Sequence, residues 1–374
     1  AGLADLAIDL AGRSASFKAS LPEGIAAALA ALVRAMNCYY SNLIEGHNTH
    51  PIDIERALKG DYSTDKGKRD LQLEARAHMT VQAWIDGGGI AGHPTDVGVL
   101  QDIHRRFCEL LPPDLLFVED PVSGERVAVV PGALRHRDVQ VGRHRAVSPG
   151  AVPRFLARTA EVYGRLGRAE AILAVAAAHH RLLWVHPFLD GNGRVARLVS
   201  HAMFLKSVDS GALWSIARGF ARNEAAYKGH LAACDLGRRN DLDGRGNLSE
   251  EALADFTRFV LTTAIDQVEF MRGLIEPDRL RARILLWAEE EARAGRLVPR
   301  AGQVIEAILY RGELPRGEVP AILGLGDRQA RRVTQQVLSD GILTAAGPRA
   351  PLRLAFPATL AGRWMPGLFP ERAD

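Results

Sequence analysis

The stretch His186–Arg197 reads His-Pro-Phe-Leu-Asp-Gly-Asn-Gly-Arg-Val-Ala-Arg, and it decides the fold of this 374-residue chain. An apolar helical pattern over 168–185 runs directly into it, and a second amphipathic helix is predicted over 194–206. Pro187 disfavours helical geometry at the residue before it, so His186 is expected where the chain leaves the first helix. The stretch is therefore predicted to be a loop between two helices of an all-α core.

This loop combines the groups that bind a polyphosphate. Gly191 and Gly193 lie beside a helix start, where backbone N–H groups can converge on an anion that the helix dipole also favours. Arg194 and Arg197 are three residues apart, so both guanidinium groups can project from one side of the first turn. Asp190 has no cation beside it in the sequence, and a phosphate-bound Mg²⁺ would give it a partner.

The same loop could also be explained without chemistry. His186 is placed to accept a proton from an attacking hydroxyl, but it could equally cap a helix in a glycine turn between two core helices. For a lone histidine or a lone glycine pair, that structural explanation is the better one. Here imidazole, carboxylate, glycines and two guanidinium groups are concentrated within twelve residues, which favours a phosphate site.

The loop also resembles the signature of Fic domains, His-Pro-Phe-x-Asp-Gly-Asn-Gly-Arg-x-x-Arg, at every specified position. The resemblance extends over roughly residues 35–270. It includes Ile103-His104, Pro131-Gly132 with Arg135, and His179. It implies an all-α core that transfers a nucleoside monophosphate, usually AMP from ATP, to Ser, Thr or Tyr hydroxyls of a target protein.

The resemblance also implies roles for the residues of the loop. It makes His186 the general base and Asp190 the ligand of Mg²⁺. It also implies that the α- and β-phosphates are bound by Gly191, Asn192 and Gly193. Arg194 and Arg197 would reach outwards along the phosphate chain.

Between 117 and 147 the helical pattern gives way to short β-like runs broken by glycines, which predicts a β-hairpin flap on the helical body. By the resemblance, part of this flap lines the nucleotide site and pairs with the target protein as an added strand. The flap residues concerned are Val139, Gln140, Val141 and Gly142. The resemblance puts Tyr227 near adenine, although Lys228 stands where the family has a second tyrosine.

The flap is also basic. A solvated face and the attraction of an acidic target or nucleotide explain this equally well. Its basic residues are Arg135, His136, Arg137, Arg143, His144 and Arg145.

A second short match, Ser41-Asn42-Leu43-Ile44-Glu45-Gly46, is to the inhibitory motif of the family. Ser41 and Glu45 are four residues apart and share a helix face, and Gly46 would end that helix. Alone, this pattern is better explained as a helix end with a solvated glutamate. Together with the complete signature, it implies that Glu45 pairs with Arg197 and prevents it from holding the γ-phosphate. Alignment of a water that removes AMP is the alternative role for Glu45.

The remainder of the chain predicts a second, smaller unit. Helical patterns over 301–310, 316–322 and 327–338 precede strand-like pieces at 342–345 and 352–356, which is the outline of a winged helix-turn-helix. The predicted division is an N-terminal helical region with the inhibitory helix (1–60), a Fic catalytic core (61–275), a helical linker (276–298) and the winged unit (299–374). DNA binding and protein docking both remain open for this unit. The side chains on 327–338 that could read bases and phosphates are Arg328, Gln329, Arg331, Arg332, Gln335 and Gln336.

Composition limits the setting of the protein. A net charge of +3 does not demand a nucleic acid or an anionic membrane, and no apolar run is long enough to span a bilayer. Three widely separated cysteines argue for reduced thiols and a cytoplasmic protein. We therefore expect an auto-inhibited protein adenylyltransferase that uses ATP and Mg²⁺, and the sequence allows a homodimer. The alternatives are another nucleotide donor, removal of AMP, or a DNA-binding regulator with a nucleotide-sensing domain.

Overall fold

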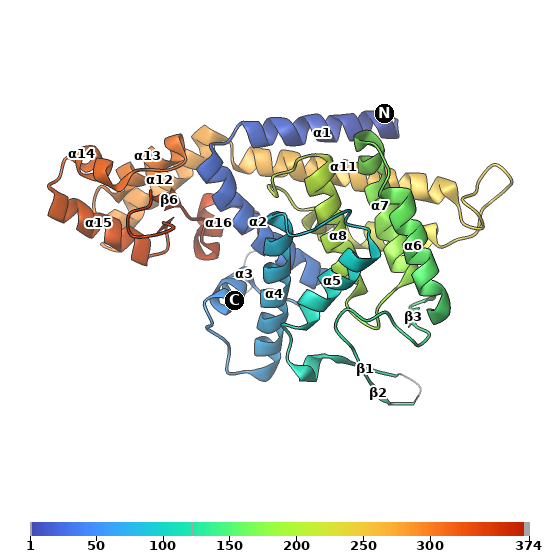
Figure 1. Cartoon of the computed structure of the whole chain (residues 1–374). Helices are drawn as coiled ribbons and strands as arrows, with labels where there is room; N and C mark the ends of the chain where they lie inside the picture. The colour runs from blue at the N-terminus through green and yellow to red at the C-terminus, as the bar shows by residue number, and fades with distance from the viewer. Residues whose placement is uncertain (1, 121–122, 370–374) are drawn as a thin grey trace.

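The computed structural model describes residues 2–120 and 123–369, which form a helical body with short β-hairpins (Figure 1). The all-α prediction is confirmed. The helices before residue 276 are α1 (Leu3–Ala19), α2 (Glu23–Ile44), α3 (Pro51–Leu58), α4 (Lys66–Asp86), α5 (Val97–Cys108), α6 (Val152–Tyr163), α7 (Arg168–Val185), α8 (Asn192–Ser207), α9 (Ile216–Arg222), α10 (Glu224–Cys234) and α11 (Glu250–Leu274). Those after it are α12 (Pro277–Arg293), α13 (Ala301–Arg311), α14 (Val319–Leu323), α15 (Asp327–Ser339) and α16 (Ala361–Trp364).

Helices α7 and α8 pack against each other at the centre of the body. Helices α2, α4 and α5 pack against α8, while α6 and α11 pack against α7. Helix α1 lies beside α11 along one flank of the molecule (Figure 1). The apolar side chains of Ile103, Phe188 and Phe204 are buried in this centre, so the loop between α7 and α8 is fixed from beneath by the core.

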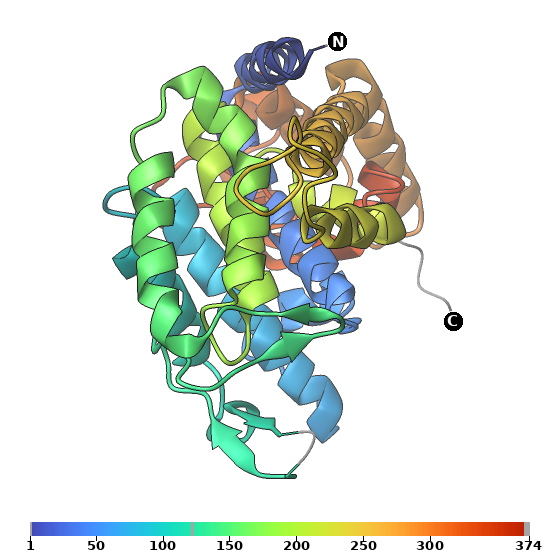
Figure 2. The same cartoon turned by 90° about the vertical axis from the view of Figure 1, so that its right-hand side faces the viewer.

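The predicted flap consists of two hairpins. The four strands are β1 (Phe117–Glu119), β2 (Arg126–Ala128), β3 (Gln140–Val141) and β4 (His144–Arg145). Strand β1 pairs antiparallel with β2, and β3 pairs antiparallel with β4. The turn between β3 and β4 contains Gly142 at φ 58°, a left-handed conformation that favours glycine. His144 Nε2 lies 2.8 Å from the carbonyl oxygen of Trp184, which brings the second hairpin to the C-terminal end of α7 (Figure 2).

The C-terminal unit has the order of elements that the sequence predicts. Helices α13, α14 and α15 precede two paired strands, β5 (Leu343–Thr344) and β6 (Arg353–Leu354). Leu314 and Leu352 exchange two backbone hydrogen bonds of 2.8 Å, which adds a further extended segment beside β6. Identification of this unit as a winged helix-turn-helix stays a prediction, as do the domain limits, and residues 370–374 lie outside the described residues.

After β6 the chain returns to the body, which the sequence analysis did not anticipate. The hydroxyl of Tyr40 donates to the carbonyl oxygen of Leu368 at 3.1 Å, and Arg218 Nη2 donates to that of Gly367 at 3.2 Å. The backbone N–H of Ala358 donates to a carboxylate oxygen of Glu55 at 2.8 Å. The C-terminal unit is therefore attached to the body by this returning segment as well as by α12.

Two general predictions concern the environment of the protein. Within residues 2–120 and 123–369, no helix combines the length and the hydropathy needed to cross a bilayer. Cys38, Cys108 and Cys234 are buried and form no disulfide. The cytoplasmic location stays a prediction.

Candidate functional site

The loop between α7 and α8 has the geometry that its sequence predicts. His186 follows the last residue of α7 and has a φ of 51°. The next two residues, Pro187 and Phe188, are buried. Gly191, at φ 76°, precedes the first residue of α8. The chain therefore turns out of one helix and into the next within six residues, with its backbone N–H groups at the start of α8.

Asn192 closes this loop. Its Nδ2 donates to the carbonyl oxygen of Phe188 at 2.9 Å, and its Oδ1 accepts from the Phe188 N–H at 2.9 Å. Both polar atoms of the amide side chain are thus engaged inside the loop. The group of Asn192 that remains for a phosphate is its backbone N–H in the first turn of α8, and its role as a phosphate ligand stays a prediction.

Arg135 holds the loop from the flap side. The guanidinium group is buried and donates to the carbonyl oxygens of His186 at 2.6 Å and Val185 at 3.2 Å. It also donates to Arg137 O at 2.7 Å, which ties the flap backbone to the end of α7. Arg135 is therefore neither part of a solvated face nor a group that attracts an acidic target or nucleotide, because this cation caps carbonyl groups inside the protein.

His186 is held as a neutral base. Its Nδ1 lies 3.3 Å from the carbonyl oxygen of Leu183, so an Nδ1–H there leaves the Nε2 lone pair available. Burial lowers the pKa of His186 to about 4, and the nearby Arg135 acts in the same direction against that hydrogen bond. At neutral pH the imidazole can therefore accept a proton.

Arg197 is engaged by two residues at the end of α2, Ser41 and Glu45. Its Nε donates to Ser41 Oγ at 2.8 Å, and its Nη2 donates to Ser41 O at 3.1 Å and to Glu45 Oε1. The side chain of Arg197 is 2% exposed and that of Glu45 is 32% exposed, so the arginine side of this ion pair is buried. The pairing of Glu45 with Arg197 that the family resemblance implies is thus present between α8 and the end of α2.

The Glu45 carboxylate lies where an anion is expected to bind. A Cβ atom at Gly193 would collide with Glu45 Oε1, so the carboxylate rests directly on the first turn of α8. Burial opposes the ionisation of Glu45, but Arg197, Arg194 and His47 outweigh it and hold the pKa of this carboxyl below its usual value. A negative charge from the end of α2 therefore lies against the first turn of α8.

Arg194 has a partner that the sequence analysis missed. Its Nη1 lies 3.4 Å from Glu74 Oε1 of α4, and Glu74 Oε2 lies 2.7 Å from His47 Nδ1. Burial opposes the ionisation of Glu74, but His47 and Arg194 outweigh it, so the pKa of this carboxyl is lowered. The only sequence signal was a glutamate on the buried face of α4, next to Ala75 and one turn before His78.

Asp190 is the one acidic side chain that the loop itself contributes. It is exposed, and none of the ion pairs among the described residues involves it. Those residues contain no group of three His, Cys, Asp or Glu side chains that could hold a metal. A lone carboxylate nevertheless fits Mg²⁺, which proteins commonly bind through one or two carboxylates together with substrate phosphates. Asp190 as the Mg²⁺ ligand stays a prediction.

The predicted flap residues lie at the tip of the second hairpin. Gln140, Val141 and Gly142 are exposed, and Val139 is half-buried. The Gln140 side chain donates to Gly142 O at 2.9 Å across the turn. His144 on the partner strand β4 contacts the end of α7. Contact of the predicted flap residues with a nucleotide or a target stays a prediction.

Tyr227 lies inside the core. Its ring is stacked on Phe220 and is 2% exposed, and its hydroxyl lies 2.7 Å from His179 Nε2. His179 Nδ1 in turn lies 2.8 Å from Ser200 Oγ. His179 therefore packs inside the core between Tyr227 and Ser200. The contact of Tyr227 with adenine stays a prediction, because this packing would have to open first.

The buried histidines make the fold sensitive to acid. Burial lowers the pKa of His78 and of His179 to about 3. In the unfolded chain both groups return to about 6.5, so between these pH values only the unfolded state binds their protons. Stability is then complete above about pH 6.5, and each group removes up to ~1.4 kcal/mol per pH unit below it. We expect the melting temperature to fall steadily from pH 6.5 to pH 5.

The variant His179→Gln tests this origin. Glutamine keeps hydrogen-bonding groups at this position but does not titrate, so the melting temperature should depend less steeply on pH. Differential scanning calorimetry at several pH values measures both slopes. Equal slopes for the variant and the wild type would exclude His179 as a source of the acid sensitivity.

Known proteins resemble both the sequence and the fold. A sequence model described as the Fic/DOC family matches residues 94–204, which include the whole loop. The protein adenylyltransferase Fic of Drosophila erecta is 24% identical over 171 residues, 43% of this chain and 32% of that protein. The protein adenylyltransferase fic-1 of Caenorhabditis elegans is 31% identical over 144 residues, 36% of this chain and 28% of that protein. The matched part thus spans about a third of the length of either relative.

Solved structures share the fold. A Fic family protein from Desulfovibrio desulfuricans G20 superimposes with a TM-score of 0.53 at 17% identity, over 94% of this chain and 96% of that one. A Fic domain containing signaling protein from Bacteroides thetaiotaomicron VPI-5482 gives 0.51 at 18% identity, over 71% of this chain and 95% of that one. Residues 94–204 thus match the Fic/DOC family model, and the chain shares its fold with solved Fic proteins.

Proposed function

We propose that this protein transfers AMP from ATP to a hydroxyl side chain of a target protein. The observation that carries the proposal is the loop between α7 and α8, which joins a neutral His186 at the end of α7 to the first turns of α8 with their backbone N–H groups and two arginines. The names of the two relatives, both protein adenylyltransferases, support the same reaction.

The chemistry follows from the groups present. His186 accepts the proton of the attacking hydroxyl, whose oxygen bonds to the α-phosphorus of ATP while the bond to the β-phosphate oxygen breaks and pyrophosphate leaves. The N–H groups of the first turn of α8 and the guanidinium groups of Arg194 and Arg197 stabilise the negative charge on the phosphates. Mg²⁺ held through Asp190 would neutralise part of that charge when bound.

Glu45 is proposed as an inhibitor of this reaction. It occupies the first turn of α8 and the guanidinium group of Arg197, which are the groups that a γ-phosphate needs. A bound ATP would meet a carboxylate of like charge there, and its α-phosphate would be turned away from the line of attack. The edge of β3, from Val139 to Gly142, is the proposed docking strand for the target protein.

Labelled ATP tests the proposal directly. The Glu45→Gly variant is incubated with lysate and with ATP that carries its label at the α- or the γ-phosphate. Transfer of AMP predicts that the α-label enters protein and the γ-label does not. Entry of the γ-label would indicate phosphate transfer, and entry of neither would contradict the proposal.

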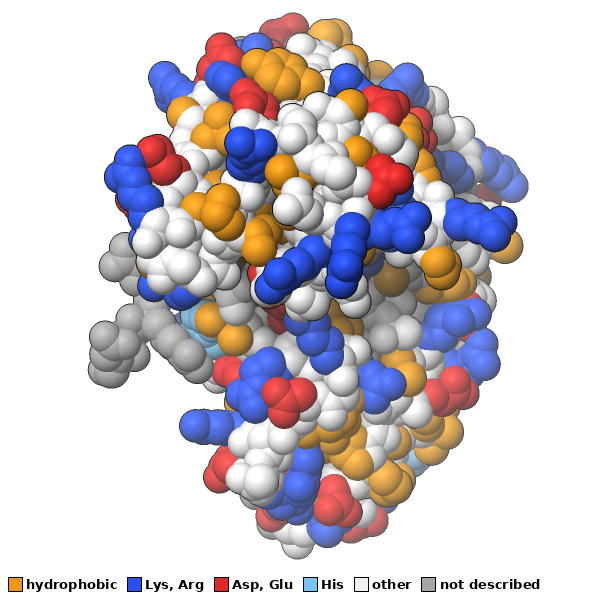
Figure 3. Space-filling model, turned by 90° about the vertical axis from the view of Figure 1, so that its left-hand side faces the viewer, with side chains coloured by type: hydrophobic (Ala, Val, Ile, Leu, Met, Phe, Trp, Pro, Cys, Tyr) orange, Lys and Arg blue, Asp and Glu red, His pale blue; other side chains and the backbone are white. Residues whose placement is uncertain are grey.

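DNA binding by the C-terminal unit is a second proposal, supported by an asymmetry in its charges. Exposed Arg311 and Arg353 are paired with glutamates, whereas Arg328, Arg331 and Arg332 on α15 are exposed and have no ion pair among the described residues. On the side of the molecule that carries the C-terminal unit, Lys and Arg side chains form a row (Figure 3). Three phosphate contacts predict that affinity for a DNA duplex falls ~40-fold between 50 and 200 mM salt.

Fluorescence anisotropy of a labelled duplex with the full chain measures this dependence. Replacing Arg328, Arg331 and Arg332 together by alanine should remove the salt-sensitive binding. The same change at the paired Arg311 and Arg353 is the matched control and should alter it little. If the wild type shows no salt-sensitive binding, the unit is better interpreted as a protein docking module.

A further inference from the structure

The two arginines of the phosphate site are each contacted by a carboxylate, but in different ways. Arg197 uses its Nε and Nη2 on Ser41 and Glu45, both from the inhibitory motif on α2. Arg194 instead offers only Nη1 to Glu74 at 3.4 Å, and its Nη2 makes no hydrogen bond to a described residue. The contact with Glu74 therefore orients Arg194 and engages one of its three guanidinium nitrogens, whereas Ser41 and Glu45 engage two of the three in Arg197.

Glu74 is itself firmly held. Its side chain is 11% exposed, and His47 binds the carboxylate oxygen that does not face Arg194. The Phe107 ring lies 5.1 Å from the Arg194 guanidinium carbon and limits its movement on another side. Arg194 thus lies between an aromatic ring and a fixed carboxylate, in a site that is almost closed to water.

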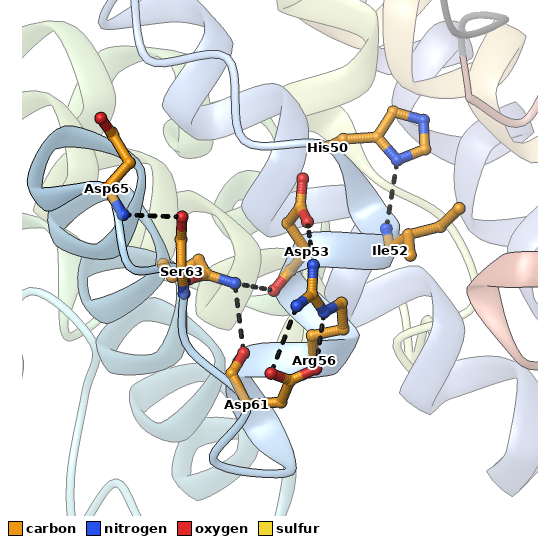
Figure 4. A network of polar contacts seen from close by, with 8 residues as sticks. His50, Ile52, Asp53, Arg56, Asp61, Ser63 and Asp65 are labelled. Atoms are coloured by element: carbon orange, nitrogen blue, oxygen red, sulfur yellow. Dashed lines mark hydrogen bonds and ion pairs between the residues drawn. The ribbon is translucent and has the colours of Figure 1, made fainter.

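The helix that carries Glu74 is anchored near its beginning. Arg56 of α3 pairs with Asp61 of the loop between α3 and α4, and in the same loop the Asp65 N–H donates to Ser63 Oγ at 3.2 Å (Figure 4). Inside α4, Gln72 accepts from the Ser63 N–H at 2.7 Å and donates to Asp53 O at 3.2 Å. These contacts fix the turn of α4 that contains Glu74 relative to α3.

We propose that Glu74 is a positioning residue that holds the Arg194 guanidinium in the orientation in which it binds a nucleotide phosphate. The inference rests on the proposed function, and it gives the two carboxylates opposite roles. Glu45 competes with the phosphate for Arg197, while Glu74 supports Arg194 during binding. Without Glu74, a phosphate would have to order a mobile arginine, which lowers affinity on the order of 10-fold.

Simple electrostatics predicts the opposite sign, which makes the proposal testable. Removal of a negative charge beside an anion site should by itself strengthen the binding of an anion. The variant Glu74→Gln removes the charge, and Glu74→Asp keeps the charge but shortens its reach. A positioning role predicts weaker nucleotide binding in both variants, whereas a purely electrostatic role predicts tighter binding for glutamine and little change for aspartate.

Calorimetric titration with ADP in the presence of MgCl₂ measures the effect without any catalytic step. ADP lacks the γ-phosphate that Glu45 opposes, so the inhibitory motif interferes least. We expect the dissociation constant to rise on the order of 10-fold in Glu74→Gln and in Glu74→Asp. Gln82→Met is the matched control, because Gln82 is also a buried polar residue of α4 but lies two turns from Glu74 and contacts Asn37 and His201. It should lower the melting temperature and leave ADP binding unchanged.

A kinetic readout separates positioning from stability. In the Glu45→Gly background, Glu74→Gln should raise the KM for ATP about as much as it raises the dissociation constant of ADP, with a smaller effect on kcat. If Glu74→Gln does not fold, Glu74→Asp carries both measurements.

Each outcome bears on one proposal. Equal or tighter ADP binding in the variants would overturn the role of Glu74 and leave the proposed function intact. An increase of label transfer by Glu74→Gln with Glu45 in place would also overturn the role of Glu74, because Glu74 would then be a second inhibitor. Absence of ADP binding to the wild type and to Glu45→Gly would instead contradict the nucleotide site itself.

Discussion

Replacing His186 by alanine is expected to reduce the transfer of α-label to protein by ~10²–10⁴-fold, the range typical for loss of a general base. The reason lies in the position and charge of this imidazole. It ends α7 at the mouth of the loop, and its pKa of about 4 keeps it neutral at the pH of the assay. Alanine cannot accept the proton of the attacking hydroxyl.

The affinity for ATP should change little in the same variant. The proposed phosphate ligands belong to α8, whereas His186 lies at the end of α7. Its imidazole contacts the carbonyl oxygen of Leu183, and its own carbonyl oxygen accepts a hydrogen bond from Arg135. Rate measurements in the Glu45→Gly background and calorimetric titration with ATP test the two halves of this prediction. Transfer at the parental rate would remove His186 from the reaction, and loss of ATP binding would point to a structural role.

Replacing Glu45 by glycine is expected to increase transfer, including self-modification, by ~10²-fold, the cost that misalignment of a reacting group can impose. The variant removes the carboxylate from the first turn of α8 and releases Arg197. Arg197 can then bind the γ-phosphate, and the α-phosphate can turn into line with the attacking hydroxyl. Label incorporated per minute from α-labelled ATP measures the change.

The double variant identifies the cause of the increase. In the Glu45→Gly background, Arg197→Ala should lower transfer again, because the clamp on the γ-phosphate is lost. Mere loosening of the end of α2 would leave the double variant as fast as Glu45→Gly. If Glu45→Gly were no faster than the wild type on any target or on itself, Glu45 would not be an inhibitor. Removal of AMP by a water aligned by Glu45 would then explain this residue better.

Much of the fold could be predicted from residues that are neighbours in the sequence. The helix expected over 168–185 has these limits in the structure. The chain leaves the helix at His186 because the next residue, Pro187, disfavours helical geometry there. On α15 the buried residues Ala330, Val333 and Val337 are those that the helical period assigns to the core. The buried residues of α1 also recur at helical spacing, at Ala7, Leu10, Ser14 and Phe17. These features depend on local backbone preference and on periodicity, which a sequence displays directly.

The arrangement of the charged groups could not be read in this way. Glu45 and Arg197 are 152 residues apart, and only the family resemblance paired them. Nothing in the sequence joins Glu74 to Arg194, Arg135 to the end of α7, or the segment after β6 to α2. The sequence alone thus determined the loop, its chemical groups and the helices on either side. The packing of α2, α4 and α8 decided which carboxylate reaches which arginine, because a buried ion pair needs two side chains within 4 Å and sequence spacing does not control the distance between helices.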